Sequence, residues 1–195
     1  MDMKIPKFED LNPKLQGFIT GVGISLLSVF TLGTYLVYFK KYKIFCDMDG
    51  VIVDFDKGYV QLDGAIELDG SYHSTEEFWA PINKMGKDFW IGLEWTEDGK
   101  ELWGYIEKYY PAILSSPSRR GFGSREGKSE WCQRELPGVP LKLEYSFNKQ
   151  KFATPESILI DDRESNVEQW RSKGGIGILH TSTKETIEEL KKLGL

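Results

Sequence analysis

The sequence predicts an α/β fold, a Rossmann-like parallel sheet with helices on both faces, and two observations lead to this class. From Lys43 onward, short apolar runs alternate with segments of helical periodicity, as in doubly wound proteins. Two of these runs end directly in paired carboxylates, at the edge where parallel sheets gather ligands. The 195 residues are enough for about one domain with a short appendage.

Each predicted element rests on a local pattern. Five apolar runs are read as strands, over residues 43–47, 112–115, 141–147, 157–160 and 176–179. Three helices are expected, over residues 101–109, 165–172 and 183–193, with apolar side chains on one face of each. Gly174 and Gly175 end the second helix, and Ser182 or Thr183 caps the third.

The N-terminal part of the chain contains a long uncharged stretch. Residues 17–39 hold no charged residue and no proline. As a helix they would be roughly 34 Å long, enough for a bilayer core of about 30 Å. We therefore expect residues 1–42 to be a tail and a transmembrane helix, and residues 43–195 to be the catalytic domain. The alternative is an interfacial helix, or one buried against that domain.

The flanks of this segment suggest how it would sit in a membrane. Tyrosines and lysines gather at its C-terminal end, as in an interfacial belt, and Lys40, Lys41 and Lys43 favour a cytoplasmic catalytic domain on a single-pass protein. Gly17 and Gly21 form a small-xxx-small pair that can seat a second copy of the helix.

Charge and cysteine content exclude several classes of protein. Beyond Lys43 the chain holds 19 basic and 27 acidic residues, so a stable nucleic-acid complex is not expected. Cys46 and Cys132 lie far apart and have neither the number nor the spacing of a disulfide framework or a zinc site, which favours a reducing compartment.

The carboxylate pairs are the strongest chemical signal. Asp47 and Asp49 follow the first predicted strand, and Asp161 and Asp162 follow the fourth. Acidic side chains at the end of a buried run are costly unless they meet a cation or a strong donor. Two such pairs at one sheet edge would form an oxygen-rich site suited to Mg²⁺. The alternative is that these acids cap helices or pair with arginines.

Four segments, in order, resemble the motifs of the haloacid dehalogenase (HAD) superfamily of phosphatases. Residues 45–51 (FCDMDGV) are similar to its first motif, and residues 113–117 (ILSSP) to its second. Lys151 falls where the lysine of the third is expected, and residues 159–163 (LIDDR) are similar to the fourth. Within the superfamily the motifs most resemble 5′(3′)-deoxyribonucleotidases, a kind of 5′-nucleotidase, and related bacteriophage HAD phosphatases.

The resemblance implies a covalent mechanism of phosphomonoester hydrolysis. Asp47 would attack phosphorus and form an aspartyl-phosphate. Asp49 would protonate the leaving oxygen and then activate water. Asp161 would bind Mg²⁺ together with Asp47 and the carbonyl of Asp49, and Asp162 would assist from outside or through water.

The same resemblance implies contacts to the phosphoryl group. Ser115 would hold a phosphoryl oxygen, with Ser116 as the second choice, and a lysine would offset the charge on the nucleophile and the phosphate. Lys149 and Lys151 are both available for this role. The interval from Lys151 to Asp161 matches the nucleotidase spacing, which favours Lys151.

Two further regions are candidates for substrate binding. Residues 55–111 correspond to the small cap of the superfamily, in which Phe89 and Trp90 would stack on a base, although such aromatics also form ordinary core. The glycine-containing run that follows the second motif carries Arg119 and Arg120, which either clamp a substrate phosphate or lie on a solvated loop.

The sequence therefore favours a magnesium-dependent phosphatase acting on a nucleotide or a nucleic-acid end at a membrane surface. A short tether also fits a membrane-held enzyme for a lipid head-group phosphate or another small phosphoester. A third hypothesis is a non-hydrolysing module that uses the fold to bind a partner, against which the complete set of candidate catalytic residues speaks.

Overall fold

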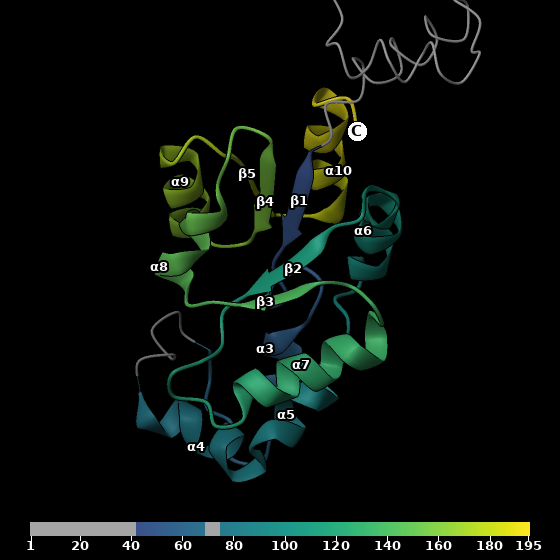
Figure 1. Cartoon of the computed structure of the whole chain (residues 1–195). Helices are drawn as coiled ribbons and strands as arrows, with labels where there is room; N and C mark the ends of the chain where they lie inside the picture. Colours follow the sequence, from purple (N-terminus) through teal and green to yellow (C-terminus); the bar gives the residue numbers. More distant parts are fainter. Residues whose placement is uncertain (1–41, 69–74) are drawn as a thin grey trace, which may run out of the picture. The chain divides into compact units, whose positions relative to one another are not determined.

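Five short strands form one fully parallel sheet in the computed structural model, which describes residues 42–68 and 75–195 (Figure 1). In order across the sheet they are β3 (Leu141–Leu143), β2 (Ala112–Ser115), β1 (Lys43–Cys46), β4 (Ser157–Asp161) and β5 (Ile176–Leu179). The strand order is the one expected of a Rossmann-like sheet, so the predicted α/β class is confirmed.

Helices cover both faces of this sheet. On one face, α9 (Glu164–Ser172) packs on β4 and β5, and Trp170 meets Phe45 edge-on at 5.4 Å between ring centroids. On the other face lie α6 (Gly99–Ile106) and α10 (Thr183–Lys192), which pack against each other. Ile187 and Leu190 of α10 join the core formed by the apolar side chains of the strands. As predicted, the Ser182 hydroxyl caps α10.

Four helices lie together beyond the carboxyl end of β1. They are α3 (Phe55–Val60), α4 (Glu76–Met85), α5 (Lys87–Gly92) and α7 (Ser124–Glu135), and Figure 1 shows them gathered at the end towards which β1 points. The predicted cap, residues 55–111, overlaps this group in α3, α4 and α5. It includes α6, which packs beside the sheet, and omits α7, which packs closely on α5.

Two local predictions were wrong. The predicted strand over residues 141–147 ends at Leu143: the Glu144 amide makes the last hydrogen bond to β2, to the Ser115 carbonyl (3.0 Å), and the chain then turns into α8 (Ser146–Lys149). A 3₁₀ turn, η4 (Gln150–Phe152), follows α8, and another, η3 (Glu107–Tyr109), follows α6. The glycines of residues 118–128, which follow the second motif, suggest a loop, yet α7 begins within this run at Ser124.

The predicted transmembrane segment, residues 17–39, lies outside the described residues. Within the part of the chain that is described, no helix is both long enough and apolar enough to cross a bilayer. The membrane tether and the cytoplasmic placement of the domain therefore stay predictions.

Candidate active site

The turn that follows β1 places the first carboxylate pair at the sheet edge. The Cys46–Ile160 pairing of β1 with β4 brings Asp47 next to the end of β4, where Asp161 lies. The chain then reverses tightly, with three successive amides, from Val51 to Val53, donating to the Met48 carbonyl. Two strands thus deliver both predicted acidic pairs to one place.

Gly50 permits the close approach of the two pairs. Its φ of +72° is a left-handed conformation that side chains rarely adopt. A Cβ at this position would lie 2.4 Å from the Asp162 Oδ2. Only glycine therefore fits between the turn and the second acidic pair without displacing it.

Lys149 lies between the two buried carboxylates of the site. Its Nζ is 2.6 Å from Asp47 Oδ2 and 2.7 Å from Asp161 Oδ2, and its side chain is 1% exposed. Burial alone would raise the pKa of Asp47, but the charges of Lys149 and Lys128 outweigh it and hold that pKa below its ordinary value. Asp47 is therefore an ionised carboxylate whose charge is balanced by lysine.

The position of Lys149 corrects the choice between the two candidate lysines. Lys151 is exposed and lies in the 3₁₀ turn that follows α8, whereas Lys149 is the last residue of α8 and points into the site. The helical turn of α8, in place of the predicted strand, determines which lysine faces inward.

The start of α9 positions Asp161, the first member of the second acidic pair. Asp161 accepts from the amide of Arg163 (3.0 Å) and from Asn166 Nδ2 at 2.9 and 3.1 Å. Burial, followed by repulsion from Asp47, raises the pKa of Asp161. Desolvation and the charges of Asp47 and Asp161 raise the pKa of Asp162 to about 7, although part of the Asp162 surface is exposed to solvent. This crowding of carboxylates favours an additional positive charge.

The donor set fits a hard divalent cation. Asp47, Asp161 and Asp162 can bring one oxygen each to within 4.8 Å of one another. Among the described residues, the buried oxygens Asp49 Oδ1 and Asn166 Oδ1 have no hydrogen-bond partner, although both residues line the same cavity. Carboxylate and amide oxygens are the ligands that Mg²⁺ prefers, so these residues fit the predicted ion.

A second buried lysine, Lys128 of α7, was not predicted to reach this site. Its Nζ is 2.6 Å from Asp49 Oδ2, 2.9 Å from the Ser115 Oγ and 3.0 Å from the Ser116 carbonyl. The side chain is 1% exposed and its Nζ lies 5.6 Å from the centre of the Trp90 ring. Lys128 therefore joins the first acidic pair to the end of β2.

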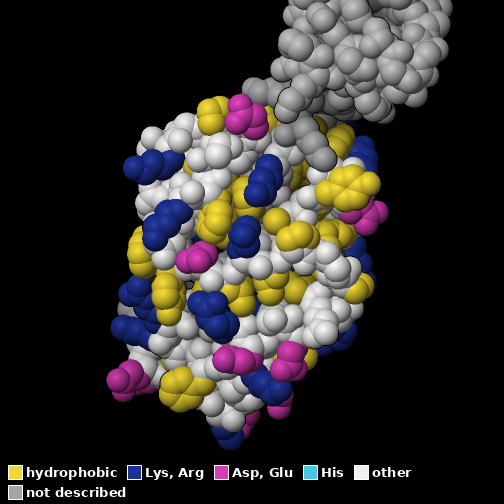
Figure 2. Space-filling model, in the orientation of Figure 1, with side chains coloured by type: hydrophobic (Ala, Val, Ile, Leu, Met, Phe, Trp, Pro, Cys, Tyr) yellow, Lys and Arg dark blue, Asp and Glu magenta, His cyan; other side chains and the backbone are white. Residues whose placement is uncertain are grey.

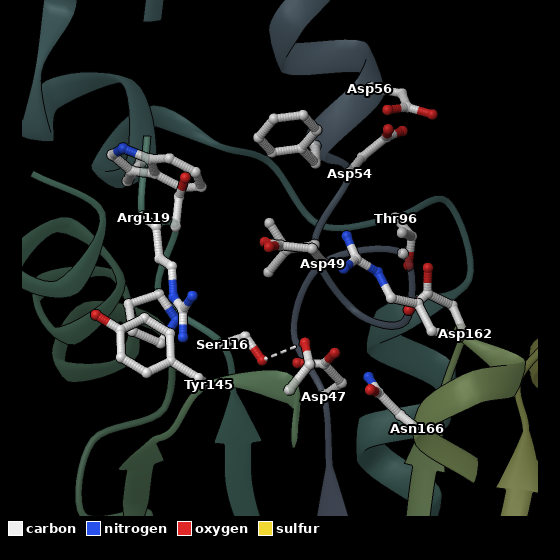
Figure 3. Close-up of a pocket in the computed structure, with 18 of the residues that line it drawn as sticks. Asp47, Asp49, Asp54, Asp56, Thr96, Ser116, Arg119, Tyr145, Asp162 and Asn166 are labelled. Atoms are coloured by element: carbon white, nitrogen blue, oxygen red, sulfur yellow. Dashed lines mark hydrogen bonds between the residues drawn. The ribbon is translucent and has the colours of Figure 1, made fainter. Parts of the chain in front are cut away.

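The two serines at the end of β2 have different surroundings. Ser115 is fully buried and its hydroxyl contacts Lys128 and Asp47. Ser116 lines the cavity, and its hydroxyl shares a hydrogen bond of 3.1 Å with that of Ser146, drawn as the dashed line in Figure 3. Ser116 thus lies at the cavity wall, whereas Ser115 is buried behind it and does not line the cavity.

A cavity of about 630 Å³ opens above these residues. Figure 3 shows Asp47, Asp49 and Asp162 at its base, with Arg119 and Tyr145 on one side and Asp54 and Asp56 at its far end. The cavity wall combines these groups with several aromatic side chains, from Phe55, Trp79, Trp90, Tyr145 and Phe147.

The structure divides the predicted substrate contacts. Arg119 lines the cavity, and so does Trp90, although the Trp90 side chain is almost completely buried and its indole donates to the Phe122 carbonyl. Phe89 is buried in the core against Phe55 and is absent from the cavity wall, as is Arg120. The ordinary-core alternative is thus the correct one for Phe89.

The contribution of α7 could have been found in the sequence. Its buried residues, Ser124, Gly127, Lys128, Trp131 and Cys132, follow the spacing of one helical face. Reading small and polar residues as part of that face would have placed Lys128 inward. Asn166, three residues into α9, carries no comparable sequence signal.

Comparison with known proteins gives only distant similarities. No protein-family model matches the chain, and a search of curated proteins finds no relative. Among solved structures, a HAD family hydrolase from Deinococcus radiodurans with bound phosphate and sodium is 15% identical, with a TM-score of 0.47, over 78% of this chain and 96% of its own.

Two other solved structures are similar at the same level. A hydrolase from Pseudomonas syringae is 13% identical with a TM-score of 0.42, over 77% of this chain and 89% of its own. An uncharacterized protein from Corynebacterium glutamicum is 17% identical with a TM-score of 0.42, over 80% of this chain and 96% of its own. Similarities this low carry no argument about activity, which must be made from the site itself.

Proposed function

We propose that this protein is a magnesium-dependent phosphomonoester hydrolase that works through an aspartyl-phosphate intermediate. One observation carries the proposal: Lys149 is buried between Asp47 and Asp161, and a second buried lysine holds Asp49, two residues after Asp47 in the chain. Buried charges are costly, and a purely structural core gains little from four of them, those of Asp47, Lys128, Lys149 and Asp161. The arrangement resembles the one that the HAD-like motifs imply, with Lys149 in the place expected for Lys151 and Lys128 as an additional buried cation.

Asp47 is the nucleophile in this proposal. Its pKa lies below the ordinary value, so the carboxylate is ionised and can attack phosphorus. The ester oxygen leaves as the new bond between Asp47 and phosphorus forms. Lys149 offsets negative charge on the nucleophile and on the phosphoryl oxygens, and the Ser116 hydroxyl at the cavity wall holds one of these oxygens.

Asp49 transfers the proton in both steps. It donates a proton to the departing ester oxygen, and in the second step it accepts one from the water that attacks phosphorus and releases phosphate from Asp47. Lys128 fixes Asp49 Oδ2 at 2.6 Å, while Oδ1 has no partner among the described residues and remains for this role. The contact orients the acid and provides positive charge beside the phosphate.

Asp47, Asp161 and Asp162, with the unpaired oxygen of Asn166 nearby, would hold Mg²⁺. The bound ion supplies positive charge that offsets the phosphoryl oxygens. Lys149 contacts only the Oδ2 oxygens of Asp47 and Asp161. Their Oδ1 oxygens accept from the backbone amides of Met48 and Arg163, and a carboxylate oxygen has a second lone pair that a cation can use.

The substrate class we propose is a nucleotide or a nucleic-acid end. The cavity, of about 630 Å³, lies in the range of sites that enclose a small molecule, and its wall combines aromatic rings with Arg119. On the face shown in Figure 2, Lys and Arg side chains are spread out with acidic side chains between them. Of the two, a nucleotide therefore fits better than the end of a long nucleic acid. From the uncharged residues 17–39 we propose in addition that the enzyme acts at a membrane surface.

Phosphate release by the full chain in mild detergent tests this proposal. The panel holds nucleoside 5′- and 3′-monophosphates, 3′-phosphorylated oligonucleotides and phosphatidic acid, each with Mg²⁺ or with EDTA. We expect release from nucleotides that EDTA and Asp47→Asn abolish, while the exposed control Asp63→Asn keeps it. Release from phosphatidic acid alone would reassign the substrate, and release that survives Asp47→Asn would reject the mechanism.

A further inference from the structure

We propose that Arg119, Tyr145 and Phe147 form a stacking platform, on the sheet side of the cavity mouth, that binds the planar base of the substrate. The inference rests on the proposed function and deepens it, because it assigns the preference for a base to residues outside the cap helices. The sequence motifs do not include these residues as a group, and the predicted base contacts were the cap aromatics Phe89 and Trp90.

The geometry of the three side chains carries the proposal. The rings of Tyr145 and Phe147 are nearly parallel, with 7° between their planes and 6.1 Å between centroids. The Arg119 guanidinium carbon lies 4.5 Å from the centre of the first ring and 5.4 Å from that of the second. All three residues line the cavity, and Figure 3 shows Arg119 beside the Tyr145 ring. Guanidinium planes and aromatic rings both stack on flat ligands, so these three side chains together suit a planar base.

The platform is fixed to the residues that would hold the phosphate. Ser146 lies between Tyr145 and Phe147 in the sequence, and its hydroxyl shares a hydrogen bond with that of Ser116. The amide of Glu144 donates to the Ser115 carbonyl. The loop of Arg119 is held by the Ser118 side chain, which accepts from the amides of the two residues after Arg119. A base stacked here would therefore stand at a defined distance from the phosphate.

The two cap aromatics predicted to contact the base offer little free surface, whereas Trp79, a third cap aromatic on the cavity wall, is half-buried. Phe89 and Trp90 are 3% and 2% exposed, and the Trp90 ring packs on those of Phe55 and Phe89. In contrast, Phe147 is 53% exposed and Arg119 is also exposed. Stacking requires an accessible π-face or guanidinium plane, which on this cavity wall the platform provides.

The test compares two substrates that differ only in the base. A nucleoside 5′-monophosphate carries phosphate, sugar and base, and ribose 5-phosphate lacks the base. In Arg119→Lys, which keeps the charge but not the plane, and in Phe147→Leu, we expect kcat/KM for the nucleotide to fall roughly tenfold, in line with the loss of one stacked base. For ribose 5-phosphate we expect a change of less than about twofold. The matched control is Phe122→Leu, since Phe122 is 66% exposed and does not line the cavity.

Two results would overturn the platform. An equal fall for both substrates would mean that Arg119 acts on the phosphate, and unchanged values for both would mean that no base rests there. Equilibrium binding of the nucleotide to Asp47→Asn, with and without Arg119→Lys, separates this inference from the proposed function. If Arg119→Lys weakens nucleotide binding but the wild-type protein releases no phosphate from any substrate, the platform is supported and the hydrolase is rejected. If the wild-type protein releases phosphate and Arg119→Lys leaves the preference for the nucleotide over ribose 5-phosphate unchanged, the hydrolase is supported and the platform is rejected.

Discussion

Replacing Lys149 by methionine is the most informative single change in this site. Methionine keeps much of the volume of lysine but removes the charge that lies 2.6 Å from Asp47 and 2.7 Å from Asp161. The matched control is Lys151→Met, two residues on, at an exposed position. Comparing the two variants tests whether Lys149, which is buried, or Lys151, which the motif spacing favours, contributes to catalysis.

The change should lower stability by a calculable amount. Removing one partner of a buried ion pair costs about 3–5 kcal/mol. For a domain of this size each kcal/mol lowers the melting temperature by about 2–4 °C, so a fall of roughly 6–20 °C is expected. An exposed substitution such as Lys151→Met should stay within about 0.5 kcal/mol. Differential scanning calorimetry of both variants measures this.

The change should also separate activity from cation binding. Without Lys149, the charge that chiefly opposes the effect of burial on the pKa of Asp47 is lost, so that pKa should rise and less nucleophile should be ionised. Loss of a preorganised charge at the reacting group typically lowers kcat by about 10²–10³-fold. The site becomes one unit more negative, so its affinity for Mg²⁺ should increase.

Steady-state kinetics and Mg²⁺ titration at a temperature where both variants are folded provide the assay. A lysine with only a structural role would lower the melting temperature without changing kcat per folded molecule. The reasoning is refuted if Lys149→Met keeps kcat within about twofold while Lys151→Met loses it.

Three further predictions concern neighbouring groups. Lys128→Met should lower kcat at least about tenfold by releasing Asp49, whereas the exposed control Lys184→Met should not; steady-state kinetics decides. Because the pKa of Asp162 is about 7 without a cation, protons should compete with Mg²⁺ for this carboxylate. The affinity for Mg²⁺, measured by calorimetry, should therefore fall as the pH drops below about 7, and Asp162→Asn should remove this pH dependence. Gly50→Ala should weaken Mg²⁺ binding in the same titration, but Gly64→Ala, at φ +86° with open space around it, should show only the backbone cost, of about 1 kcal/mol in unfolding.

The parts of the fold that the sequence predicts well are those with a strong local signal. The strands that become β1, β2, β4 and β5 are short buried runs, and the acids that follow β1 and β4 meet because parallel strands end at one edge. Register then brings Asp47 and Asp161 together without further information. This is why both acidic pairs could be named from the sequence.

The lysines could not be placed from strand register or from the hydrophobic pattern alone, because their orientation depends on tertiary contacts. Leu141 to Phe147 alternates like a strand, but the strand stops at Leu143 and α8 follows, which turns Lys149 inward. The face of α7 that is buried contains Lys128, a residue that a hydrophobic pattern scores as solvated. Its burial is explained only by partners on β1 and β2, distant in sequence.

The most direct test of the central claim is to trap the covalent intermediate. The wild-type chain is mixed with a nucleotide substrate and Mg²⁺, quenched within a turnover, reduced with borohydride and digested for mass spectrometry. An aspartyl-phosphate is reduced to homoserine, so we predict homoserine at position 47, dependent on substrate and on Mg²⁺, and absent in Asp47→Asn. Modification of another residue, or phosphate release by Asp47→Asn at the wild-type rate, would contradict the account.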